Sequence, residues 1–166
     1  FFGIILFANR EGHPVAVLEG LSDINSQKIQ QEENIRQMVS GYPIEEMLPY
    51  LLEKDPTVAA FLVSIAKKES NWGKRSPKYK SQDCYNYWGY RGPNRVGSGG
   101  HSCFATPQEA VNVVAKRIEN LVSKDIDTPE KMIIWKCGSS CAAHSKWSVT
   151  KWISDVNLYF KKLTAI

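Results

Sequence analysis

The sequence predicts a mainly α-helical protein with a small irregular or β lobe. Its 166 residues are 43% hydrophobic and 23% charged, which is typical of one globular domain with room for an appendage. Several stretches repeat apolar residues at helical spacing, whereas residues 74–102 are rich in Gly, Pro, Ser, Asn and Tyr and lack that period. These two patterns indicate a helical core, of the α+β kind, joined to a lobe of loops and short strands.

The front of the chain is expected to be an apolar segment followed by a helical extension. Residues 1–8 are apolar, but no run reaches the roughly 20 apolar residues of a membrane span. This segment predicts either the remnant of an export signal or membrane anchor, and hence a membrane tether, or a core strand. A sparse apolar stripe then predicts a helix over 22–40, with Ser22 as its N-cap, and a shorter helix follows Pro43.

The main domain is expected to span residues 54–166, with residues 1–53 as its extension. Asp55 and Pro56 form a helix start before a strongly apolar segment. Thr106 and Glu109 form a capping box that opens another helix. Helices are therefore predicted from 57 to about 71, from 107 to about 123, after Thr128, and over 145–163.

The charge balance is mildly basic. Lys and Arg number 21 and Asp and Glu 17, so the formal net charge is +4. This is too little for a dedicated nucleic-acid-binding protein, and no nucleic-acid partner is expected. An anionic polymer or a membrane surface is compatible with such a charge.

The cysteines predict two disulfides. Cys84 and Cys103 bracket a Gly-rich loop, and Cys137 and Cys141 close a tight turn, which favours these pairings among the three that four cysteines allow. Two alternatives stay open: free thiols, or zinc bound with His101 and His144, although the spacings fit common zinc patterns poorly. Disulfides imply an oxidising, extracytoplasmic compartment.

Glu69 is the strongest catalytic candidate. It ends the apolar helix where the chain enters the irregular lobe, so its carboxyl is expected to face a cleft and to be partly desolvated by Trp72. Desolvation favours the protonated form of a carboxyl, which is the form that a general acid needs. The alternative is a solvated helix-end glutamate that pairs with Lys67 or Lys68.

Three blocks of sequence, in order, resemble the lysozyme-like superfamily. Residues 68–73 (KESNWG) resemble its catalytic glutamate–serine motif, which bacterial N-acetylglucosaminidases and lytic transglycosylases carry. Residues 86–90 (NYWGY) resemble the Asn-aromatic-aromatic-Gly segment of the glucosaminidases, and residues 103–110 (CFATPQEA) resemble their aromatic residue, short turn and helix start. The resemblance covers about residues 57–122 and, more weakly, the C-terminal helices.

The resemblance implies a lysozyme-like fold with a sugar-binding cleft and Glu69 as its general acid. Aromatic rings pack against pyranose faces, and hydroxyls and amides bond their polar groups. Core packing of a small lobe is the alternative for the aromatic residues. The expected substrate-binding residues are Ser70, Asn71, Trp72, Asn86, Tyr87, Trp88, Tyr90 and His101.

A second catalytic carboxylate is harder to find. Glycosidases that use two carboxylates hold them about 5–9.5 Å apart. Asp83 is the only acidic residue between Glu69 and Glu109, so it is the candidate, with a solvated turn residue as the alternative. Lytic transglycosylases, which this sequence resembles, work with a single glutamate and use the 6-hydroxyl of the substrate as nucleophile.

The leading hypothesis is an extracytoplasmic enzyme that cleaves the β-1,4 links between amino sugars in peptidoglycan glycan strands. No metal or other cofactor is expected. The rival hypothesis is a non-catalytic cell-wall-binding or assembly module of the same fold, and a zinc-stabilised nucleic-acid module is a distant third.

Overall fold

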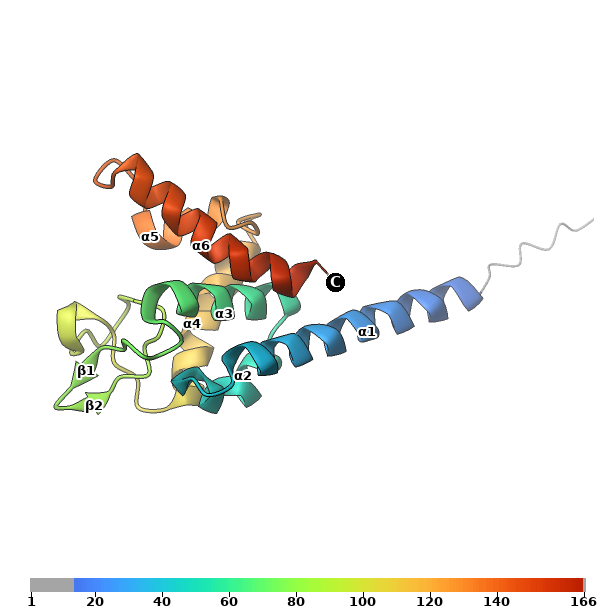
Figure 1. Ribbon diagram of the computed structural model, residues 1–166, viewed down its shortest axis with the longest axis horizontal. Helices are drawn as coiled ribbons and strands as arrows, with labels where there is room; N and C mark the ends of the chain where they lie inside the picture. The colour runs from blue at the N-terminus through green and yellow to red at the C-terminus, as the bar shows by residue number, and fades with distance from the viewer. Residues whose placement is uncertain (1–13, 166) are drawn as a thin grey trace, which may run out of the picture.

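Helix α3 (Pro56–Ser70) is the element around which the others pack (Figure 1). Its residues from Val58 to Ala66 are all buried, as expected of a helix that is apolar on every side. The structure, a computed structural model, describes residues 14–165 and the side chains of residues 23–165. The expected apolar segment 1–8 lies outside the described residues.

The other elements surround α3 in a mainly helical arrangement. The prediction of a mainly α fold with a small β lobe is confirmed. In chain order the remaining elements are α1 (Pro14–Val39), η1 (Pro43–Met47), α2 (Leu48–Leu52), β1 (Lys78–Tyr79), β2 (Gln82–Asp83), η2 (Ser98–Gly100), α4 (Pro107–Val122), η3 (Lys131–Ile133), α5 (Ile134–Cys137) and α6 (Lys146–Thr164).

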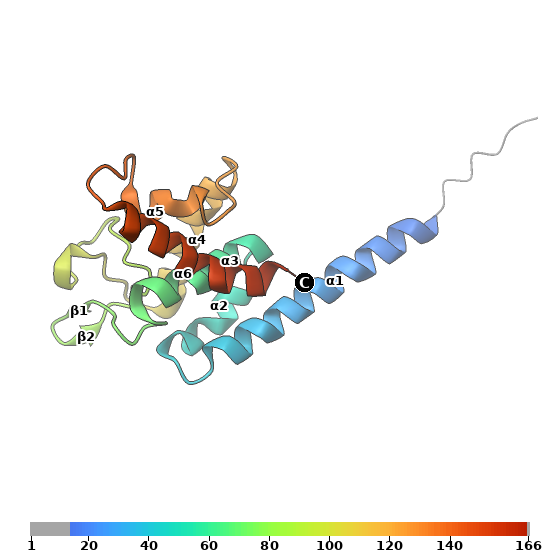
Figure 2. The same cartoon turned by 45° about the horizontal axis from the view of Figure 1, so that its top comes forward.

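Helix α1 begins earlier than the sequence predicted. It starts at Pro14, eight residues before the expected cap at Ser22. Proline suits the first helical turn, where its missing N–H is not needed. The second half of α1 contributes Ile35 and Val39 to the core, whereas residues 23–30 are exposed and extend away from the body (Figures 1 and 2). The division of the chain at residue 53 stays a prediction.

The remaining helix starts follow their capping residues. The Asp55 carboxylate accepts a hydrogen bond from Thr57 N–H, and the Thr106 hydroxyl accepts one from Glu109 N–H. Ser145 caps α6 in the same way. The helix expected after Thr128 is instead two short pieces, η3 and α5, which end before Gly138 at a positive φ of 64°.

The small lobe between α3 and α4 contains only one regular sheet. Strands β1 and β2 form an antiparallel hairpin in which Lys78 pairs with Asp83 and Tyr79 with Gln82. Both turn residues, Lys80 and Ser81, have positive φ, as a tight two-residue hairpin turn requires. The lobe lies beside the C-terminal end of α3, which is the end that contains Glu69 (Figure 1).

Candidate active site

Glu69 lies in the last turn of α3, half-buried, with its carboxyl held by the last helix. The indole N–H of Trp152 on α6 donates a hydrogen bond of 2.7 Å to Oε1 of Glu69. Helix α3 stops directly afterwards because Asn71 adopts the left-handed conformation, with φ 54° and ψ 51°. The carboxyl is thus at the junction of the helical core and the lobe, as the sequence predicted.

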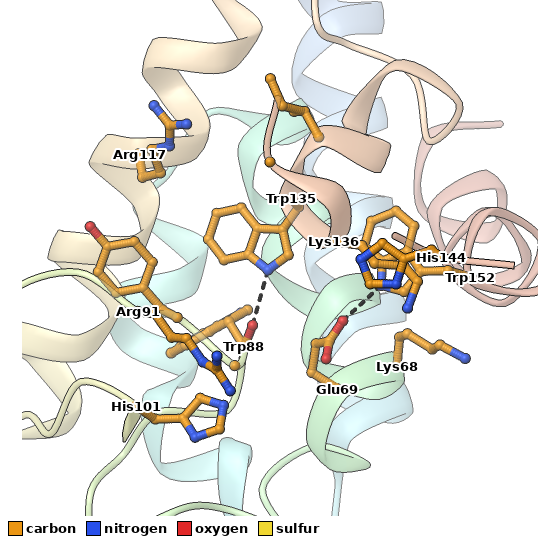
Figure 3. A pocket seen from close by; sticks show the side chains of 14 residues that line it. Lys68, Glu69, Trp88, Arg91, His101, Arg117, Trp135, Lys136, His144 and Trp152 are labelled. Atoms are coloured by element: carbon orange, nitrogen blue, oxygen red, sulfur yellow. Dashed lines mark hydrogen bonds between the residues drawn. The ribbon is translucent and has the colours of Figure 1, made fainter. Parts of the chain in front are cut away.

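Two hollows meet at Glu69, and Figure 3 shows the larger of them. The larger encloses about 550 Å³ and the smaller about 310 Å³, and both are lined by Glu69, Gly89 and His101. Together they form a groove, called here the Glu69 groove, that passes across the carboxyl. The larger hollow is also lined by residues of α4, α5 and α6, and the smaller by Ser70, Asn86 and the loops of the lobe.

The backbone of the lobe approaches the carboxyl at Gly89. A Cβ atom at this position would lie 3.3 Å from Oε2 of Glu69, closer than a side chain normally allows. Gly89 also has a φ of +65°, which glycine adopts at little cost. Glu69 is therefore enclosed by Trp152 at one oxygen and by the Gly89 backbone at the other.

A connected set of aromatic rings forms one wall of the larger hollow. Trp88 is fully buried and donates its indole N–H to the Leu62 carbonyl, while Trp135 on α5 donates to the Trp88 carbonyl at 3.0 Å. The Trp135 ring stacks on Tyr90 with centroids 5.9 Å apart, and Tyr90 stacks in turn on Phe104. These bonds fix the orientation of the wall before any ligand arrives.

Asn86 holds the loop that carries this wall. It is buried, and its amide nitrogen donates to the carbonyls of Tyr90 and Ser102 at 2.8 Å each. Its amide oxygen accepts from Tyr90 N–H at 2.9 Å. The Cys84–Cys103 disulfide closes the same loop. Asn86 borders the smaller hollow, but its hydrogen-bonding groups are already used within the protein.

Three of the expected substrate-binding residues do not line the groove. Asn71 forms the helix end, and Trp72 is buried on another side of α3, where its indole N–H donates to the Val63 carbonyl at 2.8 Å. The aromatic partner of Glu69 is Trp152, not Trp72. Tyr87 is buried, and its hydroxyl donates to Glu46. Burial, with the nearby carboxylates of Asp83 and Glu46, raises the pKa of the Tyr87 phenol, so it remains a donor.

Five expected residues do border the groove, in different ways. Ser70 lines the smaller hollow, but its hydroxyl is used within the helix end, donating to the Ala66 carbonyl and accepting from Gly73 N–H. His101 lines both hollows, and its Nδ1 lies 2.8 Å from the Ser98 carbonyl, so Nδ1–H is the donor. The groove-lining members of the predicted set are Ser70, Asn86, Trp88, Tyr90 and His101.

Asp83 is not brought to Glu69. Its carboxylate accepts hydrogen bonds from the Ser76 hydroxyl and, at 2.6 Å, from Tyr85 N–H. It lines a separate hollow together with Tyr79 and other lobe residues. Among the residues that the structure describes, Glu69 is the only carboxylate that lines either part of the Glu69 groove.

Basic side chains surround this single carboxylate. Lys68 pairs with Asp155 at 2.5 Å, and Lys151 pairs with the same carboxylate at 3.0 Å. Burial works to raise the pKa of Asp155, but the hydrogen bonds from these two lysines outweigh it, so its pKa lies below the usual value. The other basic residues that line the groove are Arg75, Arg91, Arg117, Lys136 and the two histidines His101 and His144.

The expected disulfides are both present. Cys84 is bonded to Cys103 and Cys137 to Cys141, so neither the free-thiol nor the zinc alternative holds for these cysteines. Within the described part of the chain, no group of three His, Cys, Asp or Glu residues is arranged to hold a metal ion. No helix in that part has both the length and the apolar character needed to span a membrane.

Several residues of the groove were not identified as site residues from the sequence. In the sequence, Trp135 and Trp152 are simply aromatic residues of C-terminal segments. No local pattern links Trp152 to a glutamate 83 positions earlier. Arg117 occupies an exposed position of α4 and reads as a solvated surface residue. Gly89 could have been identified from the sequence, because it lies within residues 86–90, the block that resembles a segment of the glucosaminidases.

The arrangement suits acid catalysis on a ligand that has both apolar faces and polar groups. A half-buried carboxyl at the centre of an aromatic-walled groove is placed to give a proton to a bound molecule. The basic rim favours ligands with negative charge. Comparison with known proteins adds no relative to this description: no family model, no curated protein and no solved structure matches the chain.

Proposed function

We propose that this protein cleaves the β-1,4 links between amino sugars in peptidoglycan glycan strands, with Glu69 as general acid. The observation that carries the proposal is the Glu69 groove, in which one half-buried carboxyl lies where two hollows meet. Two of the three sequence blocks that resemble the lysozyme-like superfamily, residues 68–73 and 86–90, supply residues of this groove, and this coincidence supports the same function. The third block, residues 103–110, does not line the groove, but its Phe104 stacks on the groove residue Tyr90.

The two oxygens of Glu69 have different roles in the proposed reaction. Oε1 accepts the Trp152 indole N–H, so the transferable proton belongs on Oε2, beside Gly89. Glu69 gives this proton to the glycosidic oxygen as the bond to the anomeric carbon breaks and positive charge develops on the sugar ring. The carboxylate that remains is stabilised by the Trp152 N–H and then accepts a proton from the attacking nucleophile.

The groove supports a reaction with one protein carboxylate. Asp83 lies in another hollow with its oxygens occupied, so it is not placed to act as nucleophile or base. In the transglycosylase form of the reaction, the 6-hydroxyl of the sugar attacks the anomeric carbon and leaves a 1,6-anhydro end. In the hydrolase form, water attacks and leaves a reducing end.

The test is fragment release from purified peptidoglycan by the wild type and by Glu69→Gln. We expect the substitution to abolish release while the melting temperature stays close to that of the wild type. Glu53→Gln, at an exposed carboxylate outside the groove, is the matched control and should keep wild-type activity. Mass spectrometry of the fragments then identifies anhydro or reducing ends. A Glu69→Gln variant as active as the wild type would overturn the proposal.

A wall-binding module without catalysis is the second candidate. It is favoured by the single carboxylate among the described residues of the groove, since many glycosidases need two. It predicts that the wild type sediments with insoluble wall and releases no fragments. An extracytoplasmic location of such a module would agree with the two disulfides, because disulfides form and persist in oxidising compartments.

A further inference from the structure

Two arginines line the larger hollow, and their guanidinium groups have no partner among the side chains that the structure describes. Arg91 comes from the lobe loop that follows Gly89, and Arg117 from the exposed face of α4. Among the described residues, neither guanidinium forms an ion pair, in contrast to Lys68, which is neutralised by Asp155. Both side chains therefore present an uncompensated positive charge to the groove.

Their positions place them along the path of a bound polymer. Arg91 lies with His101 on the wall that faces Glu69, and Arg117 lies beyond Trp135 (Figure 3). A chain that crosses Glu69 and continues along the aromatic wall toward α4 would pass both guanidinium groups. No other carboxylate among the described lining residues competes for these cations.

The chemistry of the guanidinium group defines what it binds. Its planar set of N–H donors matches the two oxygens of a carboxylate or a phosphate, and such charge-assisted hydrogen bonds are about twice as strong as neutral ones. A hollow lined by charge of one sign also raises the local concentration of ligands of the opposite sign.

We propose that the larger hollow is an anionic subsite, in which Arg91 and Arg117 bind a carboxylate or phosphate group carried by the glycan strand. This inference rests on the proposed function, because the strand is what brings the anion to the groove. Peptidoglycan offers two sources of this chemistry: the carboxylates of its peptide branches and the phosphates of attached polymers.

Binding is measured in a Glu69→Gln background, so that no ligand is cleaved. Soluble glycan strands that carry their peptide branches are the probe, and affinity is measured by titration at low and moderate salt. We expect the Arg91→Gln/Arg117→Gln variant to bind about tenfold more weakly than its parent and to show a weaker dependence on salt. Lys116→Gln, which removes a charge from the neighbouring position of α4 outside the hollow, is the matched control and should bind as the parent does.

Modified strands identify the source of the anion. Amidation removes the peptide carboxylates, and hydrofluoric acid removes phosphate polymers. If one of these treatments lowers the affinity of the parent for the strands but leaves that of the double arginine variant unchanged, the result supports the subsite. The treatment that has this effect identifies the anion that is bound. Equal affinity of the parent for untreated and for both treated strands, or unchanged binding by the double variant, would overturn it.

The two proposals fail in different ways. If the wild type releases no fragments but the arginine variant binds strands more weakly, the cleavage proposal fails and the anionic subsite stands. If fragments are released and the arginine variant binds and cleaves as the wild type does, the subsite fails and the cleavage proposal stands. Thermal melting of each variant confirms that the fold is retained.

Discussion

Trp152 is the residue on which the orientation of the Glu69 carboxyl depends most directly. Its indole N–H donates to Oε1, and its ring is buried between α6 and α3. Hydrogen bonds to charged groups contribute about 1.5–3 kcal/mol. The bond matters most when Glu69 has given up its proton, so removing it should act on the chemical step more than on binding.

We therefore expect Trp152→Phe to lower kcat for wall fragment release by about tenfold to a hundredfold, with little change in KM. Trp147→Phe is the matched control, since Trp147 lies on the same helix with its side chain 72% exposed and does not line the groove. The two rates are compared at a temperature at which both variants are folded by far-UV circular dichroism. A Trp152→Phe enzyme with wild-type kcat would show that the indole does not position Glu69.

Asp155 forms ion pairs where α6 packs against α3, the two helices that the Trp152–Glu69 hydrogen bond also joins. Its negative charge therefore affects the stability of the fold. It is held by Lys68 from α3 and by Lys151 from α6, and its pKa is lowered in the folded protein. A carboxyl whose folded pKa is depressed stabilises the fold above its unfolded pKa of about 3.9, and this stabilisation is lost as the pH falls through the folded pKa.

We expect Asp155→Asn to lower the free energy of unfolding by about 1 kcal/mol at pH 7, because the ion pairs are partly exposed. The difference from the wild type should persist at pH 5 and shrink as the pH falls below the usual pKa of an aspartate, because the carboxyl of the wild type, whose pKa is lowered, then becomes protonated and loses its charge. Urea unfolding at these pH values measures it, with Asp23→Asn on the exposed part of α1 as control. A difference that stays constant down to pH 2 would rule out the charge as its cause.

At the scale of elements, the loop that carries the aromatic wall depends on a crosslink. Cys84 and Cys103, 19 residues apart, close the segment that contains Asn86, Trp88 and Tyr90. A disulfide that closes a loop of about 20 residues stabilises the folded state by about 3 kcal/mol, mainly by restricting the unfolded chain. The helices on either side of the loop, α3 and α4, pack through their apolar side chains in the core and do not need this bond.

Reduction should therefore loosen the lobe before the helical core. We expect cleavage to fall at reductant concentrations where the far-UV circular dichroism is still near that of the native protein. Cys84→Ser/Cys103→Ser should show the same loss without reductant. Cys137→Ser/Cys141→Ser, whose disulfide closes a much shorter loop, should lose less stability. If the first double variant retains full binding and cleavage, the crosslink does not organise the site.

The sequence predicted elements well where a local rule determines them. The capping residues Asp55, Thr106 and Ser145 located three helix starts correctly, because a cap is a short-range hydrogen bond. The start of α1 was wrong, because Ser22 resembles a cap although the helical pattern continues back to Pro14.

The composition of the groove could not be predicted in the same way. Irregular backbone has no period from which to tell which lobe side chains face a ligand, so Tyr87 was expected in the groove although it is buried away from it. Contacts between distant helices, such as that of Trp152 with Glu69, depend on the packing of α6 against α3 rather than on any local pattern.

At the scale of the whole molecule, one buried polar side chain connects three helices. Gln31 of α1 is only 5% exposed, and its amide donates to the Leu163 carbonyl at 2.7 Å and to the Pro56 carbonyl at 3.1 Å. These acceptors lie at the end of α6 and at the start of α3. Gln31 thus lies directly after the exposed stretch 23–30 of α1, at the point where this helix first contacts the body.

We expect Gln31→Ala to lower the free energy of unfolding by about 1–3 kcal/mol, because the Leu163 carbonyl in a buried contact and the Pro56 carbonyl in a partly buried one lose this donor. For a chain of this size, that corresponds to a fall of roughly 2–12 °C in melting temperature. Gln30→Ala is the matched control: Gln30 is exposed, and its amide donates a hydrogen bond to Asn34 on the same helix, so its loss should cost little. Thermal unfolding measures both variants, and cleavage below the transition should be unchanged in each, since neither residue lines the Glu69 groove. Equal melting temperatures for the two variants would mean that the apolar contacts of α1, which include those of Ile35, Met38 and Val39, hold it to the body without a contribution from Gln31.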